Sequence, residues 1–183
     1  MLKQVQHDEF SMTNIAPVLE TARLTLRPFR GDDVDAQAAM MGDPVVMTHL
    51  GGRLPREDAW RKLLCGAAQW SLFGYGYWAV ERRGDKRLIG QVGFADFKRD
   101  MTPRIEGLPE MGWLFAADTF GQGYASEAVA AGLVWIDGAL APGQTVAIID
   151  EANHASIRVA EKAGFATREP ATYRDQPILI FRR

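Results

Sequence analysis

A strand-like run, a glycine-bearing turn and a long amphipathic helix follow one another between residues 110 and 139. Glu110–Phe115 predicts a strand, Phe120–Gly123 forms the turn, and Tyr124–Ala139 predicts a helix. The free N–H groups at the start of such a helix carry a partial positive charge, so they bind phosphate without Lys or Arg. Gly121 and Gly123 have no Cβ, so a ligand can approach the backbone closely. The junction of strand and helix is therefore a candidate phosphate site.

Two common phosphate-binding motifs do not fit this turn. A P-loop requires Gly-Lys-Ser/Thr, whereas Tyr124 follows Gly123. The dinucleotide fingerprint G-x-G-x-x-G requires a glycine where this chain has Ser126, and no acidic residue follows about 20 residues later at a strand end. Taken alone, the turn is equally consistent with glycines that only allow a tight loop.

The rest of the chain alternates helical patterns with strand-like runs joined by turns. The expected order is β-α-α-β-β-β-α-β-α-β-β, which indicates one α/β (α+β) domain with a mixed sheet covered by helices. Besides the unit above, strands are expected at 23–29, 75–81, 88–97, 145–149, 165–171 and 177–181, and helices at 34–41, from 55 to about 74, and at 150–162.

Composition excludes several classes of function. The 183 residues carry 21 Lys and Arg against 23 Asp and Glu, so the formal charge of -2 provides no large positive field for nucleic acid. No run approaches the roughly 20 apolar residues of a membrane span. The single cysteine, Cys65, excludes an internal disulfide framework and fits a reducing cytoplasm. Three scattered histidines show no metal-site spacing. We expect a cytoplasmic protein without a metal, a membrane partner or a nucleic-acid partner.

The first residues of the chain mix charged and polar side chains and lack the apolar region of a secretory signal. We therefore expect residues 1–17 to be a polar N-terminal extension, either native or left by cloning. A single domain is expected over residues 18–183.

Three separated segments are more informative together than any one of them alone. They are Glu110-Met-Gly-Trp113, Phe120-Gly-Gln-Gly-Tyr-Ala-Ser-Glu-Ala128 and Asn153-His-Ala-Ser-Ile-Arg-Val-Ala-Glu-Lys-Ala-Gly-Phe165. In this order and spacing they resemble the GNAT superfamily of acyl-CoA-dependent N-acetyltransferases. More narrowly, they resemble its RimJ/RimL-like branch, which includes ribosomal-protein acetyltransferases. Residues 19–27 and 88–94 also match that branch, so the resemblance covers nearly all of residues 19–183.

One position departs from the superfamily pattern. The turn motif of the superfamily is Gln/Arg-x-x-Gly-x-Gly/Ala, and Phe120 stands at the Gln/Arg position, followed by matching Gly123 and Ala125. An aromatic residue at this place is common in the RimJ/RimL-like branch. The departure therefore favours the narrower resemblance and does not affect the backbone donors of the turn.

The resemblance implies a single GNAT-type domain with a mixed, mostly antiparallel twisted sheet flanked by helices. It also implies acetyl-CoA as cosubstrate, with no metal. The CoA pyrophosphate would lie on the backbone of the turn and helix start, at Gln122, Gly123, Tyr124, Ala125 and Ser126.

The resemblance also implies where the pantetheine arm of CoA would lie. Main-chain hydrogen bonds to the arm are expected along the preceding strand, at Leu114, Phe115 and Ala116. Asn153 matches an asparagine whose side chain contacts the arm. Asn is equally a favourable helix N-cap, and the two roles are compatible.

The implied chemistry is attack of an amine on a thioester, and the amine must first lose a proton. Glu110 matches an acidic strand residue that acts as the base in many relatives, directly or through water. Alternation places Glu110, Gly112 and Leu114 on one face of the strand, although an exposed strand-end carboxylate would fit the same pattern. A main-chain N–H near Leu114 or Phe115 is the expected donor to the oxyanion.

A second catalytic candidate is Ser156, which lies in an Asn-x-x-Ser pattern that fits the RimL-like arrangement. It would donate a hydrogen bond or a proton to the leaving thiolate, or it is simply a small residue on the buried side of a helix. Glu127 is expected to be an acidic residue that favours the helix N-terminus.

Together, the residues and the resemblance predict an N-acetyltransferase that moves an acetyl group from acetyl-CoA to a primary amine in a ternary complex. The acceptor would be a protein N-terminus or a small-molecule amine, and a homodimer is left open. One alternative is a catalytically silent acyl-CoA-binding or sensing domain. Another is a nucleotide-binding protein of a different fold.

Overall fold

The computed structural model describes residues 16–139 and 145–183. The predicted polar extension, residues 1–17, lies outside the described residues except for its last two. Ala16 is buried, and the carbonyl of Pro17 accepts a hydrogen bond of 2.8 Å from the indole N–H of Trp78. These two residues are therefore attached to the folded domain.

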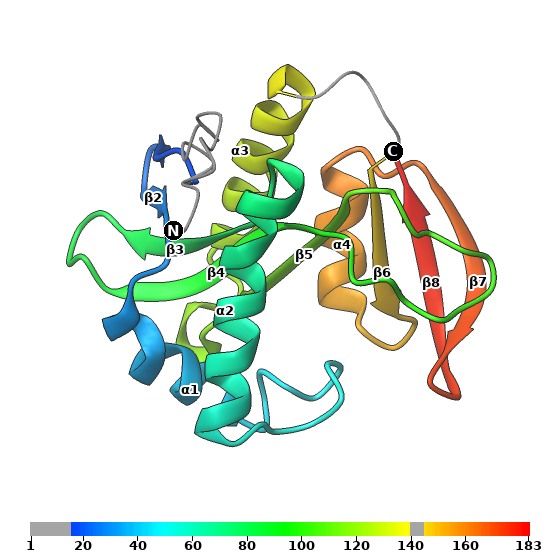
Figure 1. Cartoon of the computed structure of the whole chain (residues 1–183), viewed down its shortest axis with the longest axis horizontal. Coiled ribbons are helices and arrows are strands. Elements are labelled where there is room, and N and C mark those ends of the chain that lie inside the picture. Colours follow the sequence, from blue (N-terminus) through cyan, green and yellow to red (C-terminus); the bar gives the residue numbers. More distant parts are fainter. Residues whose placement is uncertain (1–15, 140–144) are drawn as a thin grey trace, which may run out of the picture.

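Within the described residues, eight strands form one sheet in the order β1-β2-β3-β4-β5-β6-β8-β7 (Figure 1). Neighbouring strands are antiparallel except for β5 and β6, which are parallel. The predicted mixed, mostly antiparallel sheet is thus confirmed. The strands are β1 (Leu19–Glu20), β2 (Leu24–Arg27), β3 (Tyr77–Arg82), β4 (Leu88–Ala95), β5 (Glu110–Phe115), β6 (Val146–Asp150), β7 (Thr167–Tyr173) and β8 (Gln176–Arg182).

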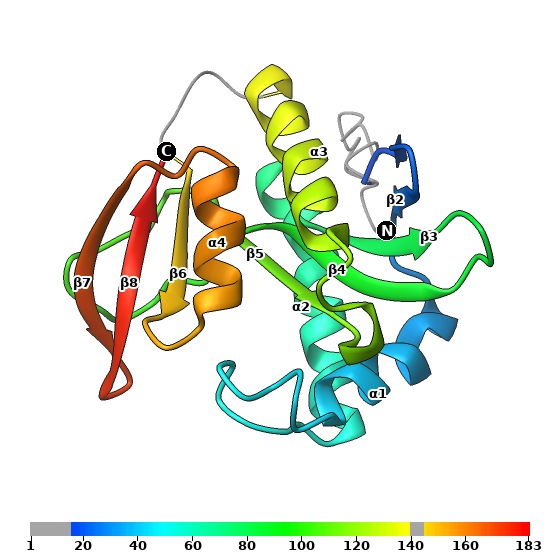
Figure 2. The same cartoon turned by 180° about the vertical axis from the view of Figure 1, so that it is seen from behind.

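Helices cover both faces of the sheet. One face carries α1 (Val34–Gly42) and α2 (Arg56–Phe73), and the other carries α3 (Tyr124–Ala139) and α4 (His154–Lys162), as the two opposite views show (Figure 1 and Figure 2). Short 3-10 turns, η1 (Gly31–Asp33) and η2 (Ala117–Thr119), precede α1 and α3. From β2 onward, the order of helices and strands predicted from the sequence is confirmed, whereas the two-residue strand β1 was not predicted.

Side chains that alternate along the strands build a core on each face. The larger core lies beneath α3 and α4 and runs from Trp78 and Phe94 on one side to Phe181 on the other. A second core, rich in methionine, lies between the sheet and the helices α1 and α2. Glu110, Gly112 and Leu114 share one face of β5, as the alternation predicted. Because Leu114 belongs to the second core, this face is turned toward α1 and α2.

The boundary between α2 and β3 differs slightly from the prediction. The helix ends before Gly74, whose φ of 73° is a left-handed conformation that glycine adopts without strain. The next strand begins at Tyr77 rather than Tyr75, because the chain must first turn back toward the sheet.

The start of β7 also differs from the prediction. It begins at Thr167 rather than Phe165, because the N–H of Phe165 donates to the carbonyl of Ala160 and closes the end of α4. Gly164, with a φ of 86°, is the predicted C′ residue of that helix. In the described part of the chain, no helix is long and apolar enough to cross a membrane.

Candidate active site

Strands β5 and β6 are paired at one residue position and then part. Glu110 of β5 lies opposite Val146 of β6, and the N–H of Val146 donates to the carbonyl of Pro109 over 3.1 Å. Beyond this position the two strands share no register pair within the described residues. Since buried main-chain groups need hydrogen-bond partners, the facing edges of β5 and β6 are suited to a ligand.

Main-chain groups of β5 point alternately toward β4 and toward this open edge. The N–H of Ala116 donates to the carbonyl of Ile89 over 2.9 Å, and the carbonyl of Ala116 accepts the N–H of Thr119 over 3.0 Å. Because antiparallel bonding repeats every second residue, Leu114 also faces β4 and Phe115 faces β6. Among the three predicted pantetheine contacts, the main chain of Phe115 is therefore the best placed. The main-chain groups of Ala116 are already bonded within the protein.

The glycine turn before α3 presents its backbone at the protein surface. Gly121 and Gly123 have φ values of 73° and 80°, which favour glycine. The N–H of Glu127 bonds to the carbonyl of Gly123 over 3.1 Å, so the N–H groups before it have no acceptor inside the helix. Residues 122–126, all five predicted pyrophosphate contacts, are exposed or half-buried. Their geometry suits an anion such as a pyrophosphate.

Glu127 does more than favour the helix N-terminus, because it ties the turn to the first strands. Its carboxylate accepts hydrogen bonds from the Thr21 hydroxyl at 2.6 Å and from the N–H and Nε of Arg23 at 2.9 and 2.7 Å. Burial raises the pKa of Glu127, but these hydrogen bonds outweigh burial and the pKa is lowered. Arg23 also donates to the carbonyl of Gln122 over 2.9 Å. The turn is therefore held from outside its own segment.

The predicted base, Glu110, is buried and paired with Arg99. Nε and Nη2 of Arg99 donate to the two carboxylate oxygens over 2.7 and 2.8 Å. The guanidinium lies near the rings of Phe97 and Tyr173, 4.8 and 4.7 Å from their centroids. Burial lowers the pKa of Arg99, but the hydrogen bonds and charge of Glu110 outweigh it and raise the pKa. Because Glu110 is only 5% exposed, the alternative of an exposed strand-end carboxylate is wrong. Its role as base stays a prediction.

Tyr77, which was not predicted as a site residue, lies on the same face of the sheet as Glu110. It is 8% exposed, and its ring reaches across the sheet to β5. A Cβ added to Gly112 would lie less than 3.0 Å from the Oη atom of Tyr77. The hydroxyl thus occupies the space that a side chain at position 112 would fill. The sequence signal for this arrangement is the pair Gly93 and Gly112 inside predicted strands.

The start of α4 contains two further predicted site residues. Asn153 is the N-cap, and its Oδ1 accepts the N–H of Ser156 over 3.1 Å. The N-cap role is therefore confirmed, and contact with the pantetheine arm stays a prediction. Ser156 is half-buried in the first turn of the helix, at the end of β6 that is not paired with β5.

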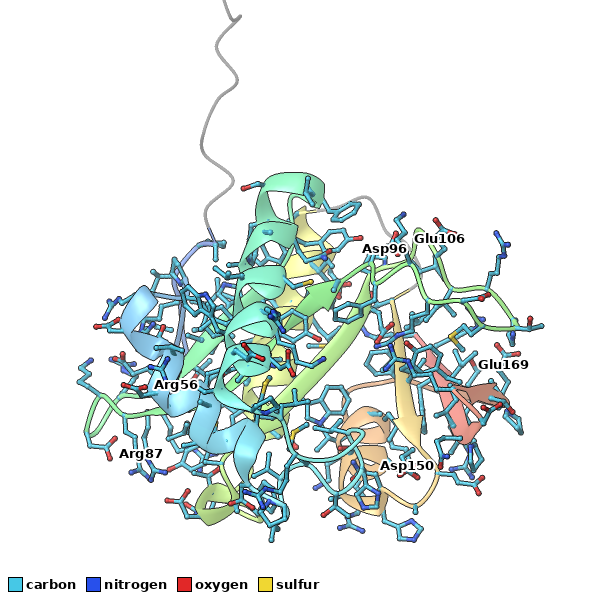
Figure 3. The ribbon with its side chains drawn as sticks, turned by 60° about the horizontal axis from the view of Figure 1, so that its bottom comes forward. Arg56, Arg87, Asp96, Glu106, Asp150 and Glu169 are labelled. Atoms are coloured by element: carbon cyan, nitrogen blue, oxygen red, sulfur yellow. The ribbon has the colours of Figure 1, made fainter. Side chains whose placement is uncertain are left out.

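The loop 43–55 between α1 and α2 is bonded to the same end of β6. Nδ1 of His49 lies 2.8 Å from Oδ2 of Asp150. Figure 3 shows Asp150 at the opposite side of the molecule from Asp96 and Glu106. The carboxylates of Asp96 and Glu106 both form ion pairs with Nζ of Lys98, at 2.8 and 3.4 Å. Within residues 16–139 and 145–183, no three His, Cys, Asp or Glu side chains are grouped so that they could hold a metal ion.

Comparison with known proteins identifies the family. Residues 23–166 match the model of the acetyltransferase (GNAT) domain. The Bacillus subtilis protein YkkB is 30% identical over 176 residues, which cover 93% of this chain and 97% of YkkB. The crystal structure of an acetyltransferase from Agrobacterium tumefaciens is similar with a TM-score of 0.78 and 28% identity, over 100% of this chain and 99% of that chain.

A structure of RimL, a ribosomal L7/L12 α-N-protein acetyltransferase in complex with coenzyme A, has the same fold. Its TM-score is 0.72 at 15% identity, over 91% of this chain and 97% of that chain. The chain belongs to the GNAT acetyltransferase family, and it is an acyltransferase. The narrower RimJ/RimL-like branch stays a prediction, because a likeness at this identity shows the fold alone.

Proposed function

We propose that this chain transfers an acetyl group from acetyl-CoA to a primary amine by direct transfer in a ternary complex. The observation that carries the proposal is the parting of β5 and β6 next to the exposed start of α3. The unpaired strand edge at Phe115 is followed along the chain by the helix N-terminus at residues 122–126. An extended ligand with a phosphate at one end would find donors and acceptors along the strand edge and N–H donors for its phosphate at the helix N-terminus.

The residues present fit acetyl-CoA, which supplies an acetyl thioester when bound. The N–H groups of residues 122–126 would hold the pyrophosphate, since anions bind at helix N-termini without basic side chains. Phe115 would bond to the pantetheine arm through its main chain and would offer its N–H to the oxyanion. Asn153 would contact the arm from the other side of the opening, at the start of α4.

In this proposal Glu110 takes the proton from the acceptor amine, directly or through a water. Arg99 fixes both oxygens of its carboxylate, so the base is held in one orientation on the face of α1 and α2. General-base catalysis of this kind contributes typically about 100- to 10,000-fold to a rate. Ser156 would donate a hydrogen bond to the leaving thiolate.

The acceptor in this proposal is a protein N-terminus or a small-molecule amine, and the chain acts in the cytoplasm. The likeness to RimL, which acetylates a protein N-terminus, is a likeness of fold, and this is its only support for a protein N-terminus as acceptor. The segment matches at 110–113, 120–128 and 153–165 remain the support for the RimJ/RimL-like branch.

A binding measurement and a rate measurement test the proposal. Acetyl-CoA should raise the melting temperature in a saturable manner, whereas NAD and ATP should not, since a ligand that binds only the native state stabilises it. CoA release should then be followed with peptides that begin with Ala or Ser and with propylamine. Glu110→Gln should abolish CoA release and keep the acetyl-CoA shift. Glu106→Gln, at an exposed carboxylate on the loop before β5, should retain both.

Three outcomes would contradict parts of this proposal. If millimolar acetyl-CoA did not raise the melting temperature, acetyl-CoA would be refuted as the cosubstrate. Binding without CoA release from any of these amines would favour the silent acyl-CoA-binding domain. Unchanged turnover of Glu110→Gln across pH would remove Glu110 as the base.

A further inference from the structure

Tyr77 is held in a slot that glycines open across three strands. Tyr77 of β3 pairs with Gly93 of β4, and Gly93 pairs with Gly112 of β5. A Cβ at Gly93 would meet the backbone of Gly76 and Tyr77 at less than 3.0 Å, and a Cβ at Gly112 would meet the Tyr77 hydroxyl. The phenol ring therefore crosses β4, and its oxygen lies over β5.

The slot is closed on its other side by α2. A Cβ at Gly66 would lie 3.1 Å from the Cβ of Tyr77, so the helix approaches the tyrosine closely. Glycine inside helices and strands destabilises them, because it has more conformational freedom to lose. Gly66 and Gly112 leave room for the side chain of Tyr77, and Gly93 leaves room for the backbone of Gly76 and Tyr77, so the hydroxyl can lie over β5.

That place is on the reactive face of the proposed site. Glu110 and Gly112 share one face of β5 and are two residues apart, about 7 Å along a strand. Both oxygens of Glu110 already accept hydrogen bonds from Arg99. Burial, and to a smaller extent the charge of Glu110, raise the pKa of Tyr77, so its phenol stays neutral. A neutral hydroxyl can accept one hydrogen bond while it donates another.

We propose that Tyr77 is a further catalytic residue, whose Oη accepts an N–H hydrogen bond from the acceptor amine and aligns its nitrogen with the acetyl carbon at the open edge of β5. The inference rests on the proposed acetyl transfer and adds the group that orients the nucleophile. Tyr77 exchanges no proton in this role. The amine proton goes to Glu110, and the tyrosine remains a phenol throughout.

Tyr75 provides a matched control for the loss of the hydroxyl. It is buried to a similar extent, at 7% exposure against 8% for Tyr77, and lies two residues earlier in the chain. Its ring stacks on Phe73 at 5.7 Å between centroids. Tyr77→Phe and Tyr75→Phe therefore remove the same atom from neighbouring buried tyrosines.

Kinetics with propylamine and acetyl-CoA test the role. Tyr77→Phe should lower kcat/KM for propylamine by about tenfold, as expected for the loss of one hydrogen bond in the reacting complex. The KM for acetyl-CoA should stay unchanged, and Tyr75→Phe should remain within about twofold of the unaltered protein. Equal effects of the two variants would overturn the proposal. Absence of CoA release in the unaltered protein would instead count against the proposed function.

A spectroscopic readout tests the contact without turnover. Protein labelled with 3-fluorotyrosine should give one fluorine signal for each of its 4 tyrosines, with Tyr77 assigned by its loss in Tyr77→Phe. Addition of propylamine to the complex with CoA should shift the Tyr77 signal and leave that of Tyr75 in place. A Tyr77 signal that does not move when propylamine binds would refute the contact.

Discussion

A methyl group at Gly112 should reveal how tightly the tyrosine slot is built. The Cβ of Gly112→Ala would lie less than 3.0 Å from the hydroxyl of Tyr77, a separation that real Cβ atoms essentially never show. Movement of the ring away from β5 is limited by α2, because a Cβ at Gly66 would already lie 3.1 Å from the Cβ of Tyr77. Overpacking of a core typically costs about 1–3 kcal/mol, and a contact with a fixed ring places this variant at about 2–3 kcal/mol.

Removal of the hydroxyl should relieve most of that cost. The next atom, Cζ of Tyr77, lies 3.3 Å from the added Cβ, so it must move by only a few tenths of an ångström. In the background of Tyr77→Phe, Gly112→Ala should therefore cost about 1 kcal/mol or less. The coupling energy of the double-mutant cycle should be about 1–2 kcal/mol, well above the usual deviation from additivity.

Urea and thermal unfolding measure this cycle directly. For a chain of this size, 1 kcal/mol corresponds to about 2–4 °C, so Gly112→Ala should lower the Tm by about 4–12 °C and the double variant by much less. Gly84→Ala is the control, because its added Cβ would meet no atom within 4 Å. Equal losses from Gly112→Ala in the two backgrounds would show that the hydroxyl does not occupy the space over β5.

Two further substitutions test charged contacts around the site. The pKa of Glu127 is lowered because hydrogen bonds from Thr21 and Arg23 outweigh burial. The Glu127 carboxylate therefore stabilises the fold above the pKa of an unfolded Glu, about 4.3, and this stabilisation is lost as the pH falls through the pKa of Glu127 in the folded protein. Urea unfolding at pH 7 should therefore find Glu127→Gln less stable by about 1–2 kcal/mol, with a gap that narrows below about pH 4. A constant gap would contradict this account. Arg99→Met leaves the buried Glu110 carboxylate without its partner and should lower the free energy of unfolding by about 3–5 kcal/mol. Adding Glu110→Gln to this variant should restore most of the loss, as measured from denaturant midpoints. No recovery would mean that Arg99 stabilises through its aromatic neighbours instead.

Local patterns were sufficient to predict most of the fold. The period of the apolar residues located α2 and α3, and glycines at 74 and 164 marked the ends of helices because they adopt positive φ. The boundary at β7 was missed because the N–H of Phe165 completes the preceding helix, a contact that strand propensity does not report.

The site was harder to predict from the sequence than the fold, because contacts between residues far apart in the chain define it. The exposed turn at 122–126 follows from local glycines and was anticipated. The pairing of Glu110 with Arg99 depends on how the loop 96–109 returns to the sheet, and neither residue signals it alone. Tyr77 was missed for the same reason. Its partner glycines lie 16 and 35 positions away on other strands, and their meeting is a matter of register.

The parting of β5 and β6 has a consequence for amide exchange. Strands in the middle of a sheet normally protect their amides through two ladders, and exchange there reports global unfolding. Trp113 and Phe115 lie in the middle of this sheet, yet by alternation their N–H groups point away from β4 and toward the unpaired edge. We therefore expect the amides of Trp113 and Phe115 to exchange faster than the other amides in the interior of this sheet. The side-chain core beneath α3 and α4, rather than the backbone ladder, joins the two parts of the sheet into one cooperative unit.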